Sequence, residues 1–269
     1  MFDRATTPAV ARKRFGQHYL VDDSVVDAII REVAPKTGDH ILEIGPGGGV
    51  LTGALVASGA QVVAVEIDRD LAARLVQRFA DAPNFTLHNE DILRFDFAHL
   101  GSAAQRWKVV GNLPYNISTP LIMRLLDASA RFEELTVMVQ REVAERLVAA
   151  PGRSDYGRLS VMAQRRARVA LRLAVGPQSF VPPPKVDSAV VQLRPFDSAL
   201  DPDFETLLAT LVRDAFGARR KTLANALRRH CDKAFLLHCG IDPASRAESL
   251  AVGDFVRLAA AVAGRQHAE

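Results

Sequence analysis

Residues 41–49 read Ile-Leu-Glu-Ile-Gly-Pro-Gly-Gly-Gly, an apolar run that ends in a glycine-rich turn. The run is typical of a buried strand, and a helical pattern begins at about Val50. Because Gly45 and Gly47 lack a Cβ atom, a ligand can approach the backbone there, and the N-terminus of the next helix can face an anionic group. The stretch predicts a strand, a ligand-binding turn and a helix.

Short β-branched runs alternate with helical patterns on both sides of this unit. The predicted strands are 40–44, 61–66, 85–88, 108–111, 135–140, 169–174 and 188–193. The predicted helices among them are 24–33, 51–58, 69–80 and 119–130. The first four strands are nearly continuous apolar runs, as expected of parallel strands buried on both faces. The alternation predicts an α/β fold with a mostly parallel, doubly wound sheet.

The chain changes in character after Arg194. Residues 195–203 have no periodicity and contain two prolines, so they are interpreted as a linker. Helical patterns follow at 204–215, 219–229, 233–237 and 252–263. We therefore predict a sheet domain over 1–196, N-terminal segment included, and a small all-α domain over 197–269.

One acidic residue ends the predicted second strand, and another follows the third. Glu66 lies 21 residues after Gly45, where a carboxylate can accept hydrogen bonds from both hydroxyls of a ribose. Asp91 follows the next strand, where it can accept from the amino group of an adenine. This layout predicts an adenosine-containing cofactor, and it fits either a nicotinamide dinucleotide or S-adenosylmethionine.

The choice between these cofactors depends on residues 111–115, Gly-Asn-Leu-Pro-Tyr, at the end of the fourth strand. The side-chain oxygen of Asn112 and the carbonyl of Leu113 can accept the hydrogens of an adenine amine, which turns its lone pair toward a methyl donor. Pro114 stiffens the turn, and Tyr115 offers a ring on which a flipped base can stack. These four residues are the predicted catalytic residues of an adenine methyltransferase. A β-turn without a function is the alternative interpretation.

Seven motifs together identify a family. They are 13–17 KRFGQ, 43–47 EIGPG, 65–68 VEID, 91–93 DIL, 111–115 GNLPY, 182–190 PPPKVDSAV and 219–223 RRKTL. With these motifs the chain resembles the small-subunit ribosomal RNA adenine dimethyltransferases. The resemblance implies a Rossmann-like, class I S-adenosylmethionine-dependent methyltransferase sheet with a small all-α C-terminal domain. It also implies N6,N6-dimethylation of two adjacent adenines near the 3′ end of 16S rRNA, on a 30S precursor particle during ribosome assembly.

The same resemblance implies which residues contact S-adenosylmethionine. They are Gly45 with Gly47 of the glycine turn, Glu66, Asp91 and Asn112, joined by His18 and Leu20 from the N-terminal motif. The family usually reads Gly-Gln-Asn-Phe-Leu where residues 16–20 read Gly-Gln-His-Tyr-Leu. His18 keeps the hydrogen-bonding capacity of the asparagine but adds a titratable group.

The distribution of charge points to RNA, since the total does not. Lys and Arg number 34 against 31 Asp and Glu, a net charge of +3. Basic residues cluster at 12–14, 165–172, 219–221 and 228–229. The predicted RNA-binding residues are Arg219, Arg220, Lys221 and Arg228, the last three on one face of a helix over 219–229. A solvated helix face is the alternative for any single cluster.

Cysteine usage and the N-terminus predict the compartment. Cys231 and Cys239 cannot form a disulfide framework, and the first residues contain no apolar signal segment. A cytoplasmic monomer without a membrane span is expected. No metal is expected either, because the pairs His230–Cys231 and His238–Cys239 are spaced too widely for one ion.

Three rival functions remain. The large-subunit rRNA methyltransferases that confer macrolide resistance share the chemistry, but the motifs at 182–190 and 219–223 favour the small-subunit group. A non-catalytic RNA-binding assembly factor or transcription factor with the same fold is disfavoured by the intact motif at 112–115. A dinucleotide oxidoreductase is the third, and binding of NAD would reveal it.

Overall fold

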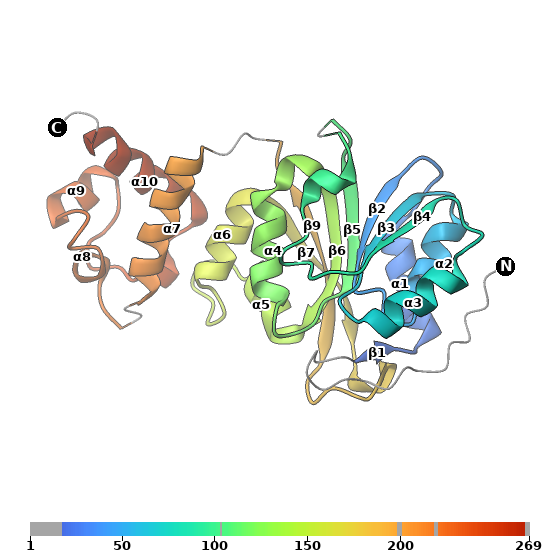
Figure 1. The fold of residues 1–269 in the computed structure, drawn as a ribbon. Coiled ribbons are helices and arrows are strands. Elements are labelled where there is room, and N and C mark those ends of the chain that lie inside the picture. The colour runs from blue at the N-terminus through green and yellow to red at the C-terminus, as the bar shows by residue number, and fades with distance from the viewer. Residues whose placement is uncertain (1–17, 103, 198–200, 218–219, 267–269) are drawn as a thin grey trace. The chain divides into compact units, whose positions relative to one another are not determined.

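A seven-stranded sheet is the centre of the computed structural model, which describes residues 18–102, 104–197, 201–217 and 220–266. Its strands are β2 His40–Ile44, β3 Gln61–Val65, β4 Phe85–His88, β5 Trp107–Asn112, β6 Phe132–Gln140, β7 Ala167–Val175 and β9 Ser188–Pro195. They lie in the order β4-β3-β2-β5-β6-β9-β7 (Figure 1). Neighbours from β4 to β6 are parallel, and β9 runs antiparallel to β6. The predicted α/β fold with a mostly parallel sheet is confirmed.

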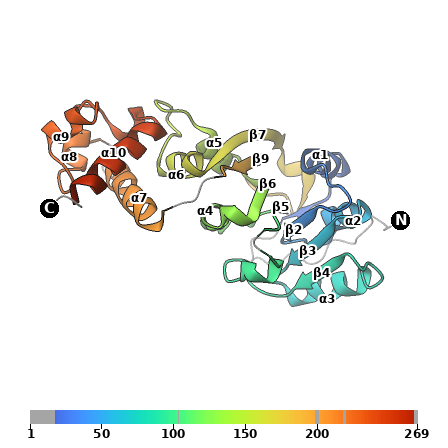
Figure 2. The ribbon, with the colours of Figure 1, turned by 90° about the horizontal axis from the view of Figure 1, so that it is seen from above.

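Helices cover both faces of this sheet. They are α1 Asp23–Val33, α2 Val50–Ala57, α3 Arg69–Arg78 and α4 Ser118–Asp127. Figure 2 shows α1 and α2 on one face of the sheet and α4 on the other. Because both faces are covered, consecutive residues of a central strand are buried, as Ile41 and Leu42 of β2 are. Each such side chain contributes about 1.5–3 kcal/mol of transfer free energy.

Aspartate side chains start two of these helices. The carboxylate of Asp22 accepts the N–H groups of Ser24 and Val25 at the start of α1. Asp68 does the same at the start of α3. Each cap satisfies N–H groups that have no partner inside the helix and typically stabilises it by about 1 kcal/mol.

The strand order reverses between β2 and β5. From β2 the chain continues to β3 and β4 on one side, and it returns to β5 on the other. The two strands approach closely at Gly111, where a Cβ atom would collide with the backbone carbonyl oxygen of Ile44. In open α/β sheets, ligands bind outside the carboxyl ends of the strands at such a reversal. Gly45 and Asn112 both lie at this place.

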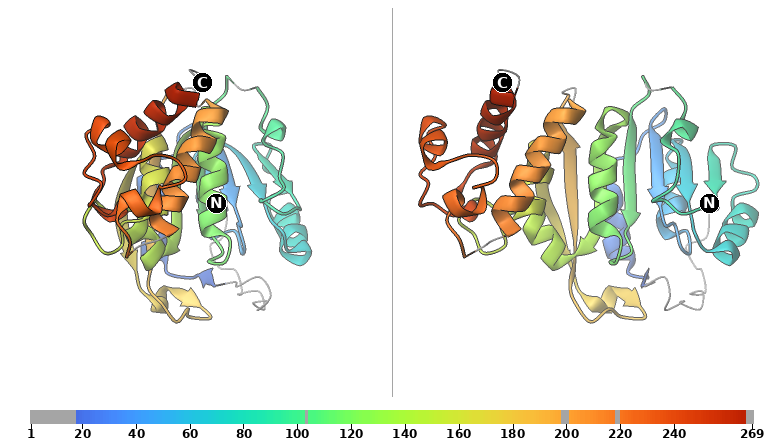
Figure 3. Two further views of the ribbon diagram at one scale, coloured as in Figure 1. Left: turned by 90° about the vertical axis from the view of Figure 1, so that its left-hand side faces the viewer. Right: turned by 60° about the vertical axis from the view of Figure 1, so that its left-hand side comes forward.

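A second, two-stranded sheet lies at the same end of the molecule. β1 (Tyr19–Leu20) pairs antiparallel with β8 (Phe180–Val181). Figures 1 and 3 show this pair beyond the carboxyl ends of the parallel strands. Neither strand was predicted from the sequence. The pairing holds the segment before α1 against the segment that leads into β9.

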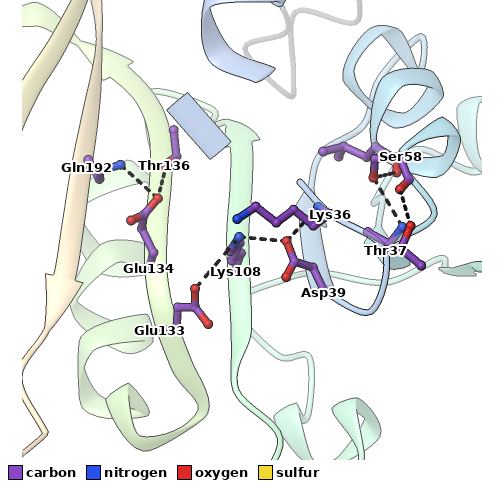
Figure 4. A network of polar contacts seen from close by, with 11 residues as sticks. Lys36, Thr37, Asp39, Ser58, Lys108, Glu133, Glu134, Thr136 and Gln192 are labelled. Atoms are coloured by element: carbon purple, nitrogen blue, oxygen red, sulfur yellow. Dashed lines mark hydrogen bonds and ion pairs between the residues drawn. The ribbon is translucent and has the colours of Figure 1, made fainter. Parts of the chain in front are cut away.

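A polar network joins the opposite, amino-terminal ends of the parallel strands. The Lys108 ammonium of β5 lies 2.8 Å from the Asp39 carboxylate before β2 and 4.0 Å from Glu133 of β6 (Figure 4). Beside it, Glu134 of β6 accepts a hydrogen bond from Gln192 of β9 at 2.9 Å. These contacts fix the strands at the end away from the reversal.

The chain forms two compact units. The first ends at Ala144 and resumes from Arg168 to Pro195, and the second contains Glu145–Ala167 and the chain from Phe196 onward. Segment 145–167 therefore groups with the C-terminal helices, whereas the domain boundary at 196/197 stays a prediction. Within the second unit, the buried Tyr156 hydroxyl donates to the carbonyl of Leu250 at 2.8 Å.

The remaining helices are short or belong to the second unit. They are α5 Arg141–Val148, α6 Arg158–Arg166, α7 Pro202–Gly217, α8 Leu223–Ala226, α9 Lys233–His238 and α10 Val252–Gln266, with 3₁₀ turns at Phe97–Leu100, Ser129–Arg131, Pro177–Ser179 and Ala247–Ser249. In the described part of the chain, no helix combines the length and the apolar character that a membrane crossing needs.

The helix predicted over 219–229 is wrong. Of the described part of that range, 220–229, only Leu223–Ala226 is α-helical. The N–H groups of Leu223 and Ala224 donate to the carbonyls of Ser245 and Pro243, and not to a preceding helical turn. The first backbone hydrogen bonds of α8 therefore go to the carbonyl of Thr222, and the helix spans four residues.

Candidate active site

The glycine turn after β2 forms one wall of the site. Gly45 and Gly47 have φ values of 63° and 56°, the left-handed conformation that favours glycine. The N–H of Gly45 donates to the carbonyl of Val65 at the end of β3, at 2.9 Å. A Cβ atom on Gly47 would lie 3.3 Å from the ring of Tyr19. The turn thus exposes backbone atoms that no side chain covers, between the end of β3 and β1.

Glu66 lies directly beside this turn and is 4% exposed. Its Oε2 atom accepts the N–H of Gly47 at 3.1 Å, and its Oε1 atom accepts the N–H of Asp68 at 2.9 Å. Burial raises the pKa of Glu66, and these two N–H groups partly offset that effect. A carboxylate has about four acceptor positions, so both oxygens keep capacity for the hydroxyls of a ribose.

Glu43 is a residue of β2 that is 1% exposed and lies close enough to Glu66 for their charges to interact. Burial raises the pKa of Glu43 to about 7, and the charge of Glu66 acts in the same direction. Among the described residues, the Oε2 atom of Glu43 has no hydrogen-bond partner. A carboxyl group in this position favours its neutral form.

Glu66 and Asp91 form an acidic edge at the ends of β3 and β4, and Ile67 lies next to it. The Asn89 amide donates to the carbonyl of Glu66 at 2.7 Å, which holds the segment before Asp91 beside the end of β3. The Oδ1 atom of Asp91 accepts the N–H of Leu93 at 2.9 Å. Ile67 is 45% exposed and offers apolar surface next to these carboxylates. The bare turn, the carboxylates and this apolar surface fit the adenosine part of S-adenosylmethionine.

Asn112 ends β5, and its amide is held by the N-terminal segment. Its Nδ2 atom donates to the backbone carbonyl of His18 at 2.9 Å. Because the two polar atoms of an amide point in different directions, Oδ1 points away from His18. Leu113 is buried, and its N–H donates to the carbonyl of Met138 in β6 at 3.0 Å. The carbonyl of Pro114 accepts the N–H of Ile117 at 3.1 Å, which closes the turn.

Tyr115 is held by its hydroxyl and by one ring face. Its Oη atom lies 2.7 Å from Oγ of the buried Ser188 at the start of β9. The His18 ring stacks on the Tyr115 ring, with centroids 5.6 Å apart and an angle of 26° between the planes. Burial raises the pKa of Tyr115, so the phenol is neutral at physiological pH. The structure thus gathers His18, Asn112 and Tyr115 at the strand reversal.

Comparison with known proteins identifies this arrangement. Residues 9–263 match the family described as Ribosomal RNA adenine dimethylase. The chain belongs to this family. A relative from Pseudomonas putida, named Ribosomal RNA small subunit methyltransferase A, is 49% identical over 96% of this chain and 97% of its own. A relative of the same name from Nitrosococcus oceani is 49% identical over 92% of this chain and 94% of its own.

Two solved structures share the fold of this dimethylase family. A dimethyladenosine transferase from Plasmodium falciparum has a TM-score of 0.79 and 28% identity, over 90% of this chain and 96% of its own. The 23S rRNA methyltransferase ErmE has a TM-score of 0.70 and 26% identity, over 91% of this chain and 99% of its own. The Rossmann-like methyltransferase fold implied by the sequence motifs is therefore confirmed.

The structure gathers most of the residues expected to contact the cofactor in this family. Gly47 donates to Glu66 and shares its turn with Gly45, whose N–H bonds to Val65 beside Glu66, and Asp91 follows β4. Leu20 is 4% exposed and packs in the core through β1, so its cofactor contact stays a prediction. Ile67 was missed, although an apolar residue between the two acids of the 65–68 motif is a recognisable signal.

The residues predicted to bind RNA lie in the second unit. Arg220 and Lys221 are exposed before α8, and Arg228 is exposed after it. Arg219 lies outside the described residues. Because α8 ends at Ala226, the prediction that one helical face carries these cations is wrong.

The basic cluster at 165–172 is partly neutralised. Arg165 and Arg166 both lie 3.2 Å from the carboxylate of Glu205. Arg172 lies 2.6 Å from Glu32. These ion pairs make the cluster a poorer phosphate site than its sequence suggested.

Among the described residues, one group has the composition of a metal site, although no metal was expected. His88, Glu90 and His99 each offer a ligand atom within 4.8 Å of the others. The two imidazoles, however, stack with an angle of 5° between their planes and 5.5 Å between centroids. An ion in the plane of one ring therefore lies out of the plane of the other, which is a poor ligand geometry.

Proposed function

We propose that this chain transfers methyl groups from S-adenosylmethionine to the N6 amines of two adjacent adenines near the 3′ end of 16S rRNA, which gives dimethyladenosines. The orientation of the Asn112 amide carries this proposal. With one Nδ2 hydrogen donated to the carbonyl of His18, the amide is oriented so that Oδ1 points away from that contact and can accept from a target. An acceptor oxygen is what an adenine amine, a donor of two hydrogens, requires.

Asn112 and Leu113 act on the target amine. The nitrogen of an adenine amine is a poor nucleophile, because its lone pair is delocalised into the ring. Two acceptors, Oδ1 of Asn112 and the carbonyl of Leu113, bind its two hydrogens and favour a pyramidal nitrogen with an exposed lone pair. No strongly basic residue is needed, since the departing proton becomes acidic as the new bond forms. Such preorganised acceptors act electrostatically in the transition state.

Pro114 and Tyr115 place the base. The closed turn at Pro114 fixes the direction of the chain after Asn112. The Tyr115 ring is held by Ser188 and offers a stacking surface for an adenine that has left its helix. Stacking of this kind is worth about 1–3 kcal/mol per base.

The cofactor lies, in this proposal, between the glycine turn and the acidic edge. Gly45 and Gly47 let it approach the backbone, Glu66 accepts from its ribose, and Asp91 accepts from its adenine. Leu20, Asn112 and the backbone of His18 complete its surroundings. When bound, S-adenosylmethionine supplies an electrophilic methyl group, so the proposal includes no metal.

The relatives support the small subunit as the substrate. Proteins named Ribosomal RNA small subunit methyltransferase A are 47–50% identical to this chain, whereas the 23S rRNA methyltransferase ErmE is 26% identical. We infer that a monomer acts in the cytoplasm on a 30S precursor particle. The cations Arg219, Arg220, Lys221 and Arg228 then contact phosphates of the RNA.

Two assays separate this function from its rivals. Calorimetry should show binding of S-adenosylmethionine and none of NAD, and the reverse result would indicate an oxidoreductase. Labelled methyl groups should pass to small subunits that lack the modification and not to large subunits. Transfer to large subunits alone would assign the chain to the 23S enzymes, and no transfer to either would indicate a non-catalytic assembly factor.

A further inference from the structure

We propose that His18 is a positioning residue that sets the Tyr115 ring for the target adenine. The inference rests on the proposed function and deepens it. It differs from the cofactor contact that the family resemblance implies for this position, because it assigns the imidazole to the RNA side of the site.

His18 contacts both ends of the catalytic segment. Its backbone carbonyl accepts from Nδ2 of Asn112 at 2.9 Å, and its ring stacks on the ring of Tyr115. A shift of residue 18 therefore moves the acceptor and the stacking surface together.

The imidazole is itself fixed by a third contact. Its Nδ1 atom lies 2.7 Å from the backbone carbonyl oxygen of Pro182. Because a carbonyl oxygen can only accept, Nδ1 carries the hydrogen and donates it. The ring cannot turn about its own axis without losing this bond. Pro182 begins the segment between β8 and β9, which leads into Ser188 at the start of β9. The imidazole therefore joins the N-terminal segment to the chain that holds the Tyr115 hydroxyl.

These contacts restrict Tyr115 from two directions. Ser188 fixes the hydroxyl, and His18 covers one face of the ring. A ring of this kind has two faces, so a stacked adenine takes the face opposite His18 and becomes the third layer of the stack. The layers hold the base at a set distance from the Oδ1 atom of Asn112.

Histidine at position 18, where the family usually carries asparagine, adds a contact that asparagine cannot make. The asparagine that the family usually carries can donate to the carbonyl of Pro182 as Nδ1 of His18 does, but it offers no ring. The imidazole supplies both the hydrogen bond and the stacking surface. With Nδ1 engaged by Pro182, only Nε2 is left for other partners.

Three substitutions separate these contributions. His18→Phe keeps a ring and loses the donor, His18→Asn keeps the donor and loses the ring, and His18→Ala loses both. Pro182 is exposed, so water can satisfy its carbonyl in the phenylalanine variant. His238→Ala, at an exposed position in α9, is the matched control and should behave as wild type.

The assay is methyl transfer to unmethylated small subunits, with kcat and KM determined for the particle, beside calorimetry with S-adenosylmethionine. His18→Ala and His18→Asn should lower kcat/KM for the particle by about two- to tenfold, the worth of one aromatic pair. His18→Phe should restore most of that loss. The dissociation constant of S-adenosylmethionine should stay within about twofold in all three variants. In a Tyr115→Ala background, His18→Ala should cause no further loss.

Two results would overturn the inference. One is weaker binding of S-adenosylmethionine with an unchanged kcat at saturation, which would place the imidazole on the cofactor. The other is wild-type behaviour of His18→Ala throughout. If the wild-type protein itself transferred no methyl group, the proposed function would fail. The inference would then be decided by thermal unfolding, where His18→Ala and Tyr115→Ala should shift Tm non-additively and additive shifts would refute the contact.

Discussion

The side-chain nitrogen of Asn112 donates to the backbone carbonyl of His18 across the strand reversal, at 2.9 Å. The donor ends β5, and the acceptor precedes β1, 94 positions earlier in the chain. This bond assigns the amide orientation on chemical grounds, because a carbonyl oxygen faces a nitrogen and not a second oxygen. The geometry at the target amine therefore depends on the N-terminal segment as well as on the catalytic motif.

Replacement of Asn112 tests the acceptor role. Asn112→Ala removes Oδ1, so kcat should fall by about 10²–10³, the usual loss for one preorganised polar group. Asn112→Asp should be comparably poor, since it places a carboxylate oxygen against the carbonyl of His18. Steady-state methyl transfer measures the effect, and Tm should stay close to wild type. A normal rate for Asn112→Ala would contradict the mechanism.

Replacement of Tyr115 separates its ring from its hydroxyl. Tyr115→Phe keeps the stacking face, so kcat/KM should remain within a few-fold of wild type. The buried Ser188 hydroxyl then loses its partner, which should lower the free energy of unfolding by about 1–3 kcal/mol. Tyr115→Ala should lose the stacking, a decrease of about 1–3 kcal/mol in RNA interaction. Equal activities of the two variants would mean that the ring does not hold the base.

Glu43 predicts a pH dependence of stability. Its pKa is raised from 4.5 to about 7 in the folded protein, so the native state keeps a proton that the unfolded chain releases between these values. Its contribution to stability is full below pH 4.5 and is lost as the pH rises to about 7, by at most about 3 kcal/mol. Glu43→Gln should therefore become more stable relative to wild type across this window.

Urea unfolding at several pH values measures this difference. Glu142→Gln, at an exposed position in α5, is the control and should give a flat difference. A flat difference for Glu43→Gln as well would show that Glu43 is ionised in the native protein.

The exposed cations near α8 predict a salt dependence of RNA binding. Replacement of Arg220 and Lys221 by Ala should weaken binding and lower the slope of log K against log salt by about 0.7–0.9 per lost phosphate contact. S-adenosylmethionine binding should be unchanged, because both residues lie in the second unit. Arg69→Ala with Arg74→Ala, both exposed on α3, is the matched control. An unaltered slope in the first pair would place the RNA surface elsewhere.

Periodicity was sufficient to predict the sheet and the helices that cover it. Strands 40–44 and 85–88 match the structure at both ends, because buried parallel strands are apolar runs bounded by turns. The helix over 219–229 failed, since its basic and apolar residues follow a helical pattern while its N–H groups bond to Pro243 and Ser245. Such a tertiary contact leaves no local signal.

The candidate site was predictable in its residues and not in its connections. Glycines, acids and the motif at 112–115 follow strand ends, so their meeting at one edge follows from a parallel sheet. The pairing of β1 with β8 spans most of the first unit in sequence, and two residues per strand carry no periodicity. The contact of His18 with Tyr115 depends on that pairing, so only the structure reveals it.

Dimethylation of two neighbouring adenines of the small subunit, as proposed for this chain, can be measured directly. The direct measurement is mass-spectrometric mapping of rRNA from unmethylated small subunits after incubation with S-adenosylmethionine and either the wild-type protein or Asn112→Ala. If the proposal holds, N6,N6-dimethyladenosine should be found at two adjacent positions near the 3′ end with the wild-type protein, and unmodified adenines with the variant at the same time. Modification at any other site, or an unmodified 3′ end with the wild-type protein, would contradict it.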